Sequence, residues 1–215
     1  MLSESISRNS ILLGIFAIVA TAIVAGTQLQ TKTRIADNIR HAEERALVAI
    51  VPKDIHDNSM LDDFVLVDDK TLLGLRREKK AYIALMKGKP ISVILPATAP
   101  DGYTGDIDLI VGINVDGTIA GVRVLNHRET PGLGDKVEKK KSDWVDGFIG
   151  HSLKNPTKEQ WAVKRDGGVF DQFTGATITP RAVTAAVKKA LEYFETNKER
   201  LLVPSPPIEE VPNNG

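Results

Sequence analysis

The sequence contains no cysteine, few aromatic residues and no excess of positive or negative charge. Without cysteine, the 215-residue chain can form no disulfide, thiolate zinc site, iron–sulfur ligation or cysteine nucleophile of its own. Aromatic residues make up only 5% of the chain, too few for a platform on which the bases of single-stranded nucleic acid stack. The 28 basic side chains are balanced by 28 acidic ones, whereas nucleic-acid-binding domains usually carry a basic excess. We therefore expect no nucleic acid among its partners.

Charged side chains are also missing from residues 9–31, whose centre reads ILLGIFAIVATAIVAG. A helix needs about 20 mostly apolar residues to cross a bilayer, so this run is long enough to span one. A buried core helix is disfavoured because the run is apolar on every face. A cleaved signal peptide is disfavoured because the uncharged stretch continues well past the small-residue site Ala20-Thr-Ala22. Residues 1–31 are therefore predicted to form a short N-terminus and a retained membrane anchor.

The charges that flank this run do not decide its orientation. Lys32, Arg34 and Arg40 follow the run, and only Arg8 and the amino terminus precede it. A literal positive-inside count would keep the C-terminal part in the cytoplasm, yet long domains are translocated largely regardless of flanking charge. The topology therefore stays open on charge alone.

A juxtamembrane helix is predicted directly after the anchor, in residues 32–52. Apolar residues recur there at the three- and four-residue spacing of an amphipathic helix, and Pro52 is expected to end it. These apolar residues are Ile35, Ile39, Ala42, Ala46 and Ile50. At the other end of the chain, four prolines among residues 201–215 predict a disordered tail.

The part between these segments, residues 53–200, is predicted to be an α+β domain. Its strands come as hairpins and do not alternate with helices, which favours an antiparallel or mixed sheet. Turns are expected at residues 88–90 and at Asp116-Gly117. The predicted strands are residues 64–67, 81–86, 91–95, 107–113 and 119–125.

Two helices are predicted toward the C-terminal end of this domain. A short one, opened by Asp135, would place on one face Val137, Trp144, Val145 and Phe148. The longer one has good start signals, with Thr179 as its N-cap and Pro180 at its first helical position. Its apolar stripe consists of Val183, Ala186, Val187, Ala190, Leu191 and Phe194.

The longer helix is preceded by a segment of small residues and threonines, and together they read DQFTGATITP over residues 171–180. Small residues allow a bulky ligand to approach the backbone. A helix N-terminus also provides free N–H groups and a partial positive charge, which favour an anion such as phosphate. From the residues alone, an ordinary capped helix start without a ligand explains the segment at least as well.

The order of residues in this segment resembles the recognition sequence of FMN transferase, Asp-x-x-Thr-Gly-Ala-Thr. That enzyme moves FMN from FAD onto a threonine hydroxyl of its acceptor protein. The resemblance implies that the last threonine of the motif, Thr177, carries FMN through a phosphoester bond. The other implied members of the cofactor site are Asp171, Thr174, Gly175 and Ala176, with Asp171 serving attachment and not electron transfer.

A second motif, ETPGLG at residues 129–134, follows the strand predicted to end at residue 125. Alone it would be interpreted as a Pro-Gly turn. It resembles a loop of the same FMN-binding domain family, and the two motifs occur in that family's order. The resemblance implies that Glu129, Thr130, Leu133 and Gly134 lie at the flavin. Leu133 would contact the ring, and Glu129 and Thr130 could reach its polar edges.

The whole arrangement, from the anchor to about Phe194, resembles the RnfG family of the Rnf (Rsx) electron-transport complexes. It includes both motifs, Gly102-Tyr103, Ser142-Asp-Trp144 and residues 161–168. The resemblance implies an electron-carrying subunit of an ion-translocating membrane oxidoreductase, which links ferredoxin and NAD or keeps a redox regulator reduced. It also implies a bacterial inner-membrane location, a cytoplasmic N-terminus, a periplasmic FMN domain, and as partners the other subunits and FMN transferase.

A flavin would supply the chemistry, so no residue is expected to act as a catalytic acid, base or nucleophile. No metal site is expected either, because the four histidines lack metal-ligand spacing: His41, His56, His127 and His151. Two alternatives remain. One is the related C-type subunit of the sodium-translocating NADH:quinone reductase, which shares the flavin motif. The other is a membrane-anchored periplasmic binding or scaffold protein without a redox role.

Overall fold

The computed structural model describes residues 2–203. The chain divides after Glu43 into an N-terminal helical unit and a domain that begins at Glu44. The predicted disordered tail, residues 201–215, lies outside the described residues from residue 204 onward. Its first residue, Leu201, is buried as the last residue of helix α2 (Ile178–Leu201), so the folded domain continues past residue 200.

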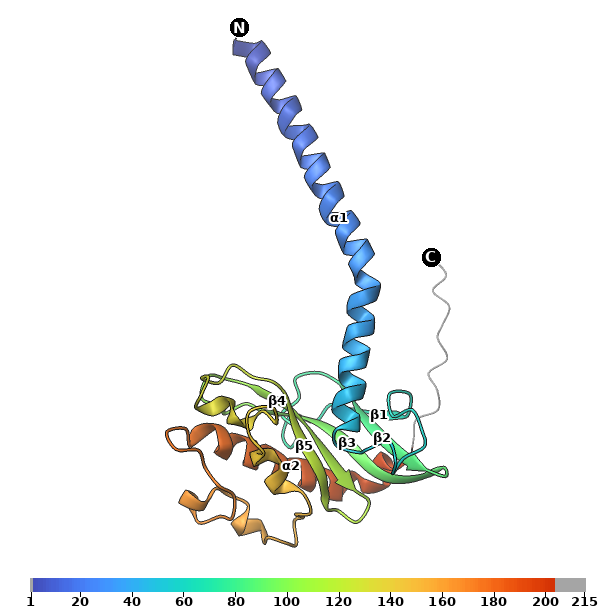
Figure 1. The fold of residues 1–215 in the computed structure, drawn as a ribbon, viewed down its shortest axis with the longest axis vertical. Helices are drawn as coiled ribbons and strands as arrows, with labels where there is room; N and C mark the ends of the chain where they lie inside the picture. Colours follow the sequence, from blue (N-terminus) through green and yellow to red (C-terminus); the bar gives the residue numbers. More distant parts are fainter. Residues whose placement is uncertain (1, 204–215) are drawn as a thin grey trace. The chain divides into compact units, whose positions relative to one another are not determined.

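A single helix, α1 (Leu2–Val48), contains the apolar run and most of the predicted juxtamembrane helix (Figure 1). It is the one helix in residues 2–203 that is long and apolar enough to cross a membrane. Its large apolar side chains between residues 11 and 24 are all more than half exposed. The hydroxyls of Thr27 and Thr31 donate to the carbonyl oxygens of Ile23 and Thr27, both at 2.8 Å. These polar groups are thus satisfied within the helix, as an apolar surrounding requires.

The domain is built on a five-stranded antiparallel sheet in which sequence neighbours pair throughout (Figure 1). The strands are β1 (Phe64–Val67), β2 (Lys79–Met86), β3 (Lys89–Ala99), β4 (Ile107–Asn114) and β5 (Ile119–Asn126). The predicted strands and the α+β class are confirmed, and the sheet is antiparallel, not mixed. The first hairpin turn is tighter than expected. Lys87 and Gly88 both have positive φ, so Pro90 already belongs to β3.

One face of the sheet packs against α2 (Figure 1). The whole predicted apolar stripe of this helix is buried, from Val183 to Phe194. Alternate strand residues such as Val93, Leu95 and Leu109 meet it from the sheet, because successive side chains of a strand point to opposite faces. This core fixes where the N-terminus of α2 lies relative to the loops that connect the strands.

The end of α1 and the segment that follows it pack against the other set of alternate strand residues. This apolar layer joins Leu47, Ile50, Val51 and Met60 to Ala84, Ile94 and Ile110. Helix α1 ends at Val48, four residues before Pro52, so the proline is not the immediate stop signal. Arg123 of β5 instead donates from Nη2 to the carbonyl oxygen of Ala49 at 3.0 Å, next to the end of the helix.

The segment predicted as one short helix between Asp135 and Phe148 is instead two 3-10 helices, η1 (Gly134–Val137) and η2 (Trp144–Phe148). Glu138 has an extended backbone, with φ −75° and ψ 130°, which ends η1 and separates the two turns. Two further 3-10 turns, η3 (Lys158–Gln160) and η4 (Lys164–Asp166), precede α2.

Candidate functional site

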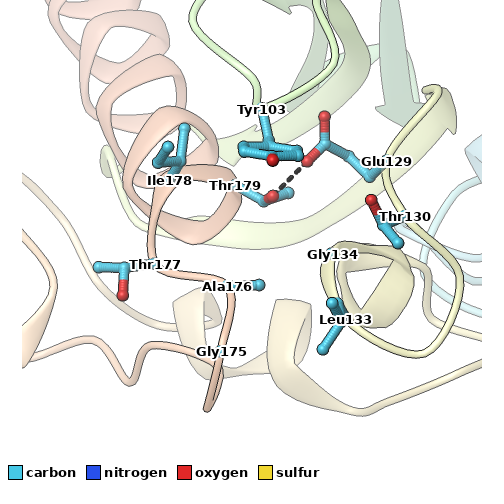
Figure 2. Close-up of a pocket in the computed structure, with 10 residues that line it drawn as sticks. All are labelled: Tyr103, Glu129, Thr130, Leu133, Gly134, Gly175, Ala176, Thr177, Ile178 and Thr179. Atoms are coloured by element: carbon cyan, nitrogen blue, oxygen red, sulfur yellow. Dashed lines mark hydrogen bonds between the residues drawn. The ribbon is translucent and has the colours of Figure 1, made fainter.

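A cavity of about 320 Å³ lies where the loop after β5 meets the N-terminus of α2 (Figure 2). Its lining comes from three segments and comprises Tyr103, Glu129, Thr130, Leu133, Gly134, Gly175, Ala176, Thr177, Ile178 and Thr179. The two sequence motifs, far apart in the chain, therefore contribute to one site. Sequence reasoning did not assign Tyr103, Ile178 or Thr179 to the cavity. Tyr103 belongs to a segment that was quoted for the family resemblance, and Ile178 and Thr179 directly follow Thr177.

Two predicted cofactor residues, Asp171 and Thr174, are exposed and do not line this cavity. The Asp171 carboxylate pairs with Lys164 at 2.6 Å. Its backbone carbonyl accepts a hydrogen bond from the indole N–H of Trp144 at 2.7 Å. The Trp144 ring also packs edge-on against Phe173, with ring centroids 5.1 Å apart. Trp144 therefore holds the beginning of the motif in place, outside the cavity.

Glu129 is buried in the site, with only 4% of its surface exposed. Its Oε1 atom accepts hydrogen bonds from the backbone N–H and the hydroxyl of Thr104, both at 3.0 Å. Its Oε2 atom accepts the hydroxyl hydrogen of Thr179 (Figure 2). Burial alone would raise the pKa of Glu129, but these bonds and one from the backbone of Tyr103 lower it overall. The carboxylate is therefore ionised at neutral pH, a buried negative charge in the wall of the cavity.

The predicted start of α2 is wrong by two residues. The helix begins at Ile178 with Thr177 as its N-cap, so Thr179 and Pro180 lie within the first turn. Thr179 is 1% exposed, and its hydroxyl is bonded to Glu129, fifty residues earlier, instead of to a free N–H group of the helix. A Thr-Pro pair is a common helix start, but here the threonine hydroxyl donates its hydrogen bond to a distant buried carboxylate.

Gly134 allows the loop to approach this pair of residues closely. A Cβ atom at this position would lie 2.8 Å from Oγ1 of Thr179 and 2.9 Å from Oε2 of Glu129. Both distances are shorter than non-bonded carbon and oxygen atoms tolerate, so any larger residue would separate the loop from α2. The Glu129–Thr179 bond and Gly134 together hold the two motifs in contact.

Thr177 combines an uncommitted hydroxyl with a helix terminus. Its backbone is helical, with φ −85° and ψ −28°, and its side chain makes no capping hydrogen bond. Its hydroxyl is directed away from the Glu129–Thr179 pair (Figure 2). Two residues earlier, Gly175 has φ +83°, a left-handed conformation that favours glycine and brings this turn against Leu133. The free N–H groups that begin α2 lie at the same end and favour an anion.

The residues of the site fit both ends of FMN. Three large side chains are exposed at the cavity, Tyr103 by 65%, Leu133 by 42% and Ile178 by 43%. Apolar and aromatic surface of this kind suits a flat ring, and the N-terminus of α2 suits a phosphate group. Within residues 2–203, no cluster of His, Cys, Asp and Glu side chains could hold a metal ion.

Comparisons with known proteins agree with both motifs. Residues 102–192 match the family model of the FMN-binding domain, and residues 1–50 match that of the RnfG N-terminal region. The chain is 52% identical over 201 residues to the G-type subunit of the ion-translocating oxidoreductase complex of Pseudomonas aeruginosa, covering 94% of each chain. It is 47% identical over 201 residues to the protein of that name from Shewanella loihica, covering 94% of this chain and 95% of the relative. A solved structure, NqrC of Shewanella oneidensis, is 24% identical with a TM-score of 0.47, covering 69% of this chain and 76% of that one.

Proposed function

The chain belongs to the RnfG family of ion-translocating oxidoreductase complexes, and we propose that it carries electrons in such a complex through an FMN attached to Thr177. The observation that carries this proposal is the convergence of the loop 129–134 and the segment 175–179 on one cavity. A bound flavin accepts and donates electrons, and the protein's part is to hold it, orient it and adjust its electronic surroundings.

Residues at the cavity and just outside it serve different parts of this function. Thr177 provides the hydroxyl to which the FMN phosphoryl group is joined, at a helix end that favours its negative charge. Leu133 and Tyr103, exposed at the cavity, provide apolar surface for the ring. Asp171 and Thr174 are exposed outside the cavity, so FMN transferase can reach them while the flavin is being attached.

Mass spectrometry of the intact protein, purified from a host that expresses FMN transferase, tests the attachment. The wild-type mass should rise by one FMN less one water, and a denaturing gel should show a fluorescent band. Thr177→Val keeps the branched shape without the hydroxyl and should lose both signals, whereas Thr177→Ser keeps a hydroxyl and should retain them. Flavin on Thr177→Val would place the attachment elsewhere. Wild-type protein without flavin would favour a binding or scaffold protein without a redox role.

The proposal includes a location in the bacterial inner membrane, with the N-terminus in the cytoplasm and the FMN domain in the periplasm. The uncharged run of α1, with its exposed apolar side chains, supports a membrane anchor. Covalent attachment suits a periplasmic domain because a dissociated flavin could not readily be replaced there. A reporter that is active only in the periplasm, fused to the C-terminus, should be active, and activity of a cytoplasmic reporter there would contradict the topology.

The expected partners are the other subunits of the complex and, during maturation, FMN transferase. Relatives with 47–52% identity are named as subunits of an ion-translocating oxidoreductase complex, which supports a shared assembly. Copurification from membranes, with identification of the associated subunits, distinguishes this complex from a sodium-translocating NADH:quinone reductase.

A further inference from the structure

His127 lies just before the loop 129–134 and has both ring nitrogens engaged. Its Nδ1 atom accepts a hydrogen bond from the backbone N–H of Glu129 at 3.0 Å. Its Nε2 atom lies 2.8 Å from Oε1 of Glu138. Only 10% of the His127 side chain is exposed, so both contacts are largely shielded from water.

These two contacts define one protonation state of the ring. A ring nitrogen that accepts a hydrogen bond carries no hydrogen, so the hydrogen of neutral His127 is on Nε2, which donates it to Glu138. A second proton would have to be placed on Nδ1, where it would face the N–H group of Glu129. Protonation therefore keeps the contact with Glu138 and breaks the contact with Glu129.

The two partners of His127 stand at opposite ends of one segment. Glu129 opens the loop, and Glu138 is the residue that ends η1. Between them lie Thr130, Leu133 and Gly134, which line the cavity. We infer that His127 is a positioning residue that holds the beginning of this segment through the N–H of Glu129 and thereby sets the loop against the flavin, while Glu138 fixes the ring. The inference rests on the proposed function, because the loop matters through the cofactor beside it.

Among the other charged groups near His127, Arg123, Lys139 and Glu129 have partners of their own. A hollow beside the ring is lined by Arg123, Lys139 and Lys140, together with uncharged residues from the end of α1. Arg123 and Lys139 both pair with Asp146, and the carboxylate of Glu129 is turned toward threonines on the cavity side. Glu138 is thus the anion that faces the ring.

Two amide substitutions separate the two contacts. An Asn side chain accepts a hydrogen bond from the N–H two residues later in an Asx turn, so His127→Asn keeps an acceptor for Glu129 but does not reach Glu138. The longer His127→Gln places its amide near the Nε2 position, which keeps the contact with Glu138 and leaves the N–H of Glu129 unpaired. His56→Asn is the control, since Nδ1 of His56 is bonded to the carbonyl oxygen of Pro52, in the segment after α1.

Hydrogen exchange of the full-length protein in detergent, measured by mass spectrometry, tests the contact between His127 and Glu129 without any flavin. Amides of residues 128–134 should exchange at the wild-type rate in His127→Asn and His56→Asn. In His127→Gln they should exchange about tenfold faster, the factor expected for one lost hydrogen bond. Wild-type exchange in His127→Gln would overturn the inference. Should His127→Gln fail to fold, His127→Asn decides, because rapid exchange of this segment there would also overturn it.

A second measurement follows the flavin itself, in protein from a transferase-competent host. At neutral pH, iodide should quench its fluorescence more strongly in His127→Gln than in the wild type, because a released loop covers the ring less. Quenching should stay at the wild-type level in His127→Asn. Equal quenching in His127→Gln and the wild type would overturn the inference. Wild-type protein without covalent flavin would refute the proposed function and leave the exchange result standing.

Discussion

Thr179→Val removes the hydroxyl that donates to Glu129 while preserving the branched shape of the side chain. A hydrogen bond to a charged group contributes about 1.5–3 kcal/mol to stability. With Thr179 1% exposed and Glu129 4% exposed, water cannot easily replace the lost donor. We therefore expect the free energy of unfolding to fall by about 2–3 kcal/mol. At about 2–4 °C per kcal/mol for a domain of this size, Tm should fall by roughly 4–12 °C. An N-cap threonine would contribute only about 1 kcal/mol.

The same substitution should weaken the pH dependence of stability in acid. Hydrogen bonds hold the pKa of folded Glu129 below its usual value. Glu129 therefore contributes stability that is fully present above its unfolded pKa, about 4.3, and is lost as pH falls through the lower folded pKa. Without the Thr179 donor, the folded pKa rises toward the unfolded one and this contribution shrinks. The stability difference between wild type and Thr179→Val should thus decrease below about pH 4.

Thermal unfolding of the full-length protein in detergent, followed by tryptophan fluorescence at pH 7 and in acid, measures both effects. Thr179→Ser is the matched control, because it keeps the hydroxyl and loses one buried methyl group, at a cost of about 1 kcal/mol. Equal losses of stability in the Val and Ser variants at pH 7 would refute the reasoning. So would a difference between wild type and Thr179→Val that does not depend on pH.

Three further outcomes are expected for the ring, its potential and the anchor. Leu133→Ala should leave the FMN mass intact but change the visible circular dichroism of the flavin, and an unchanged spectrum would mean that Leu133 does not contact the ring. Glu129→Gln should raise the flavin midpoint potential by tens of millivolts, because a nearby negative charge opposes the addition of electrons. A potentiometric titration checks this, and an unchanged or lower potential would contradict it. Full-length protein should stay with membranes after a carbonate wash, because residues 9–31 can span a bilayer. Soluble protein cleaved between residues 20 and 22 would show a signal peptide instead.

The strands and α2 could be predicted because their signals are local. Ile107 to Ile113 alternate in a pattern typical of a strand, and Gly117 supplies the positive φ, +89°, that the turn after it requires. The turn at Lys87 was misplaced because a lysine with φ +53° is uncommon and no neighbouring residue signals it. The prediction of a single helix from Asp135 to Phe148 was wrong for a similar reason, since no sequence signal at Glu138 indicates an extended backbone.

The motifs indicated which two segments would meet, whereas the contacts between them could not be predicted. Thr177 and Leu133 stand in recognisable segments, and both line the cavity. Thr179 was assigned to the helix start because its sequence neighbours favour that role, whereas its partner is fifty residues away. The hydrogen bond from Trp144 to the carbonyl of Asp171 could not be predicted either. Sequence spacing contains no information on which distant groups meet.

The contacts of Glu129 change what this residue can do for a flavin. From the sequence, its carboxylate was expected to reach a polar edge of the ring. In the structure, both oxygens accept hydrogen bonds from the protein, Oε1 from two groups of Thr104 and Oε2 from Thr179. A carboxylate offers about four acceptor positions, so most of its capacity is used before any cofactor binds. We therefore expect Glu129 to act on the flavin mainly through its buried charge and through the loop that it holds. This is why a substitution that removes the charge tests its role more directly than one that shortens the side chain.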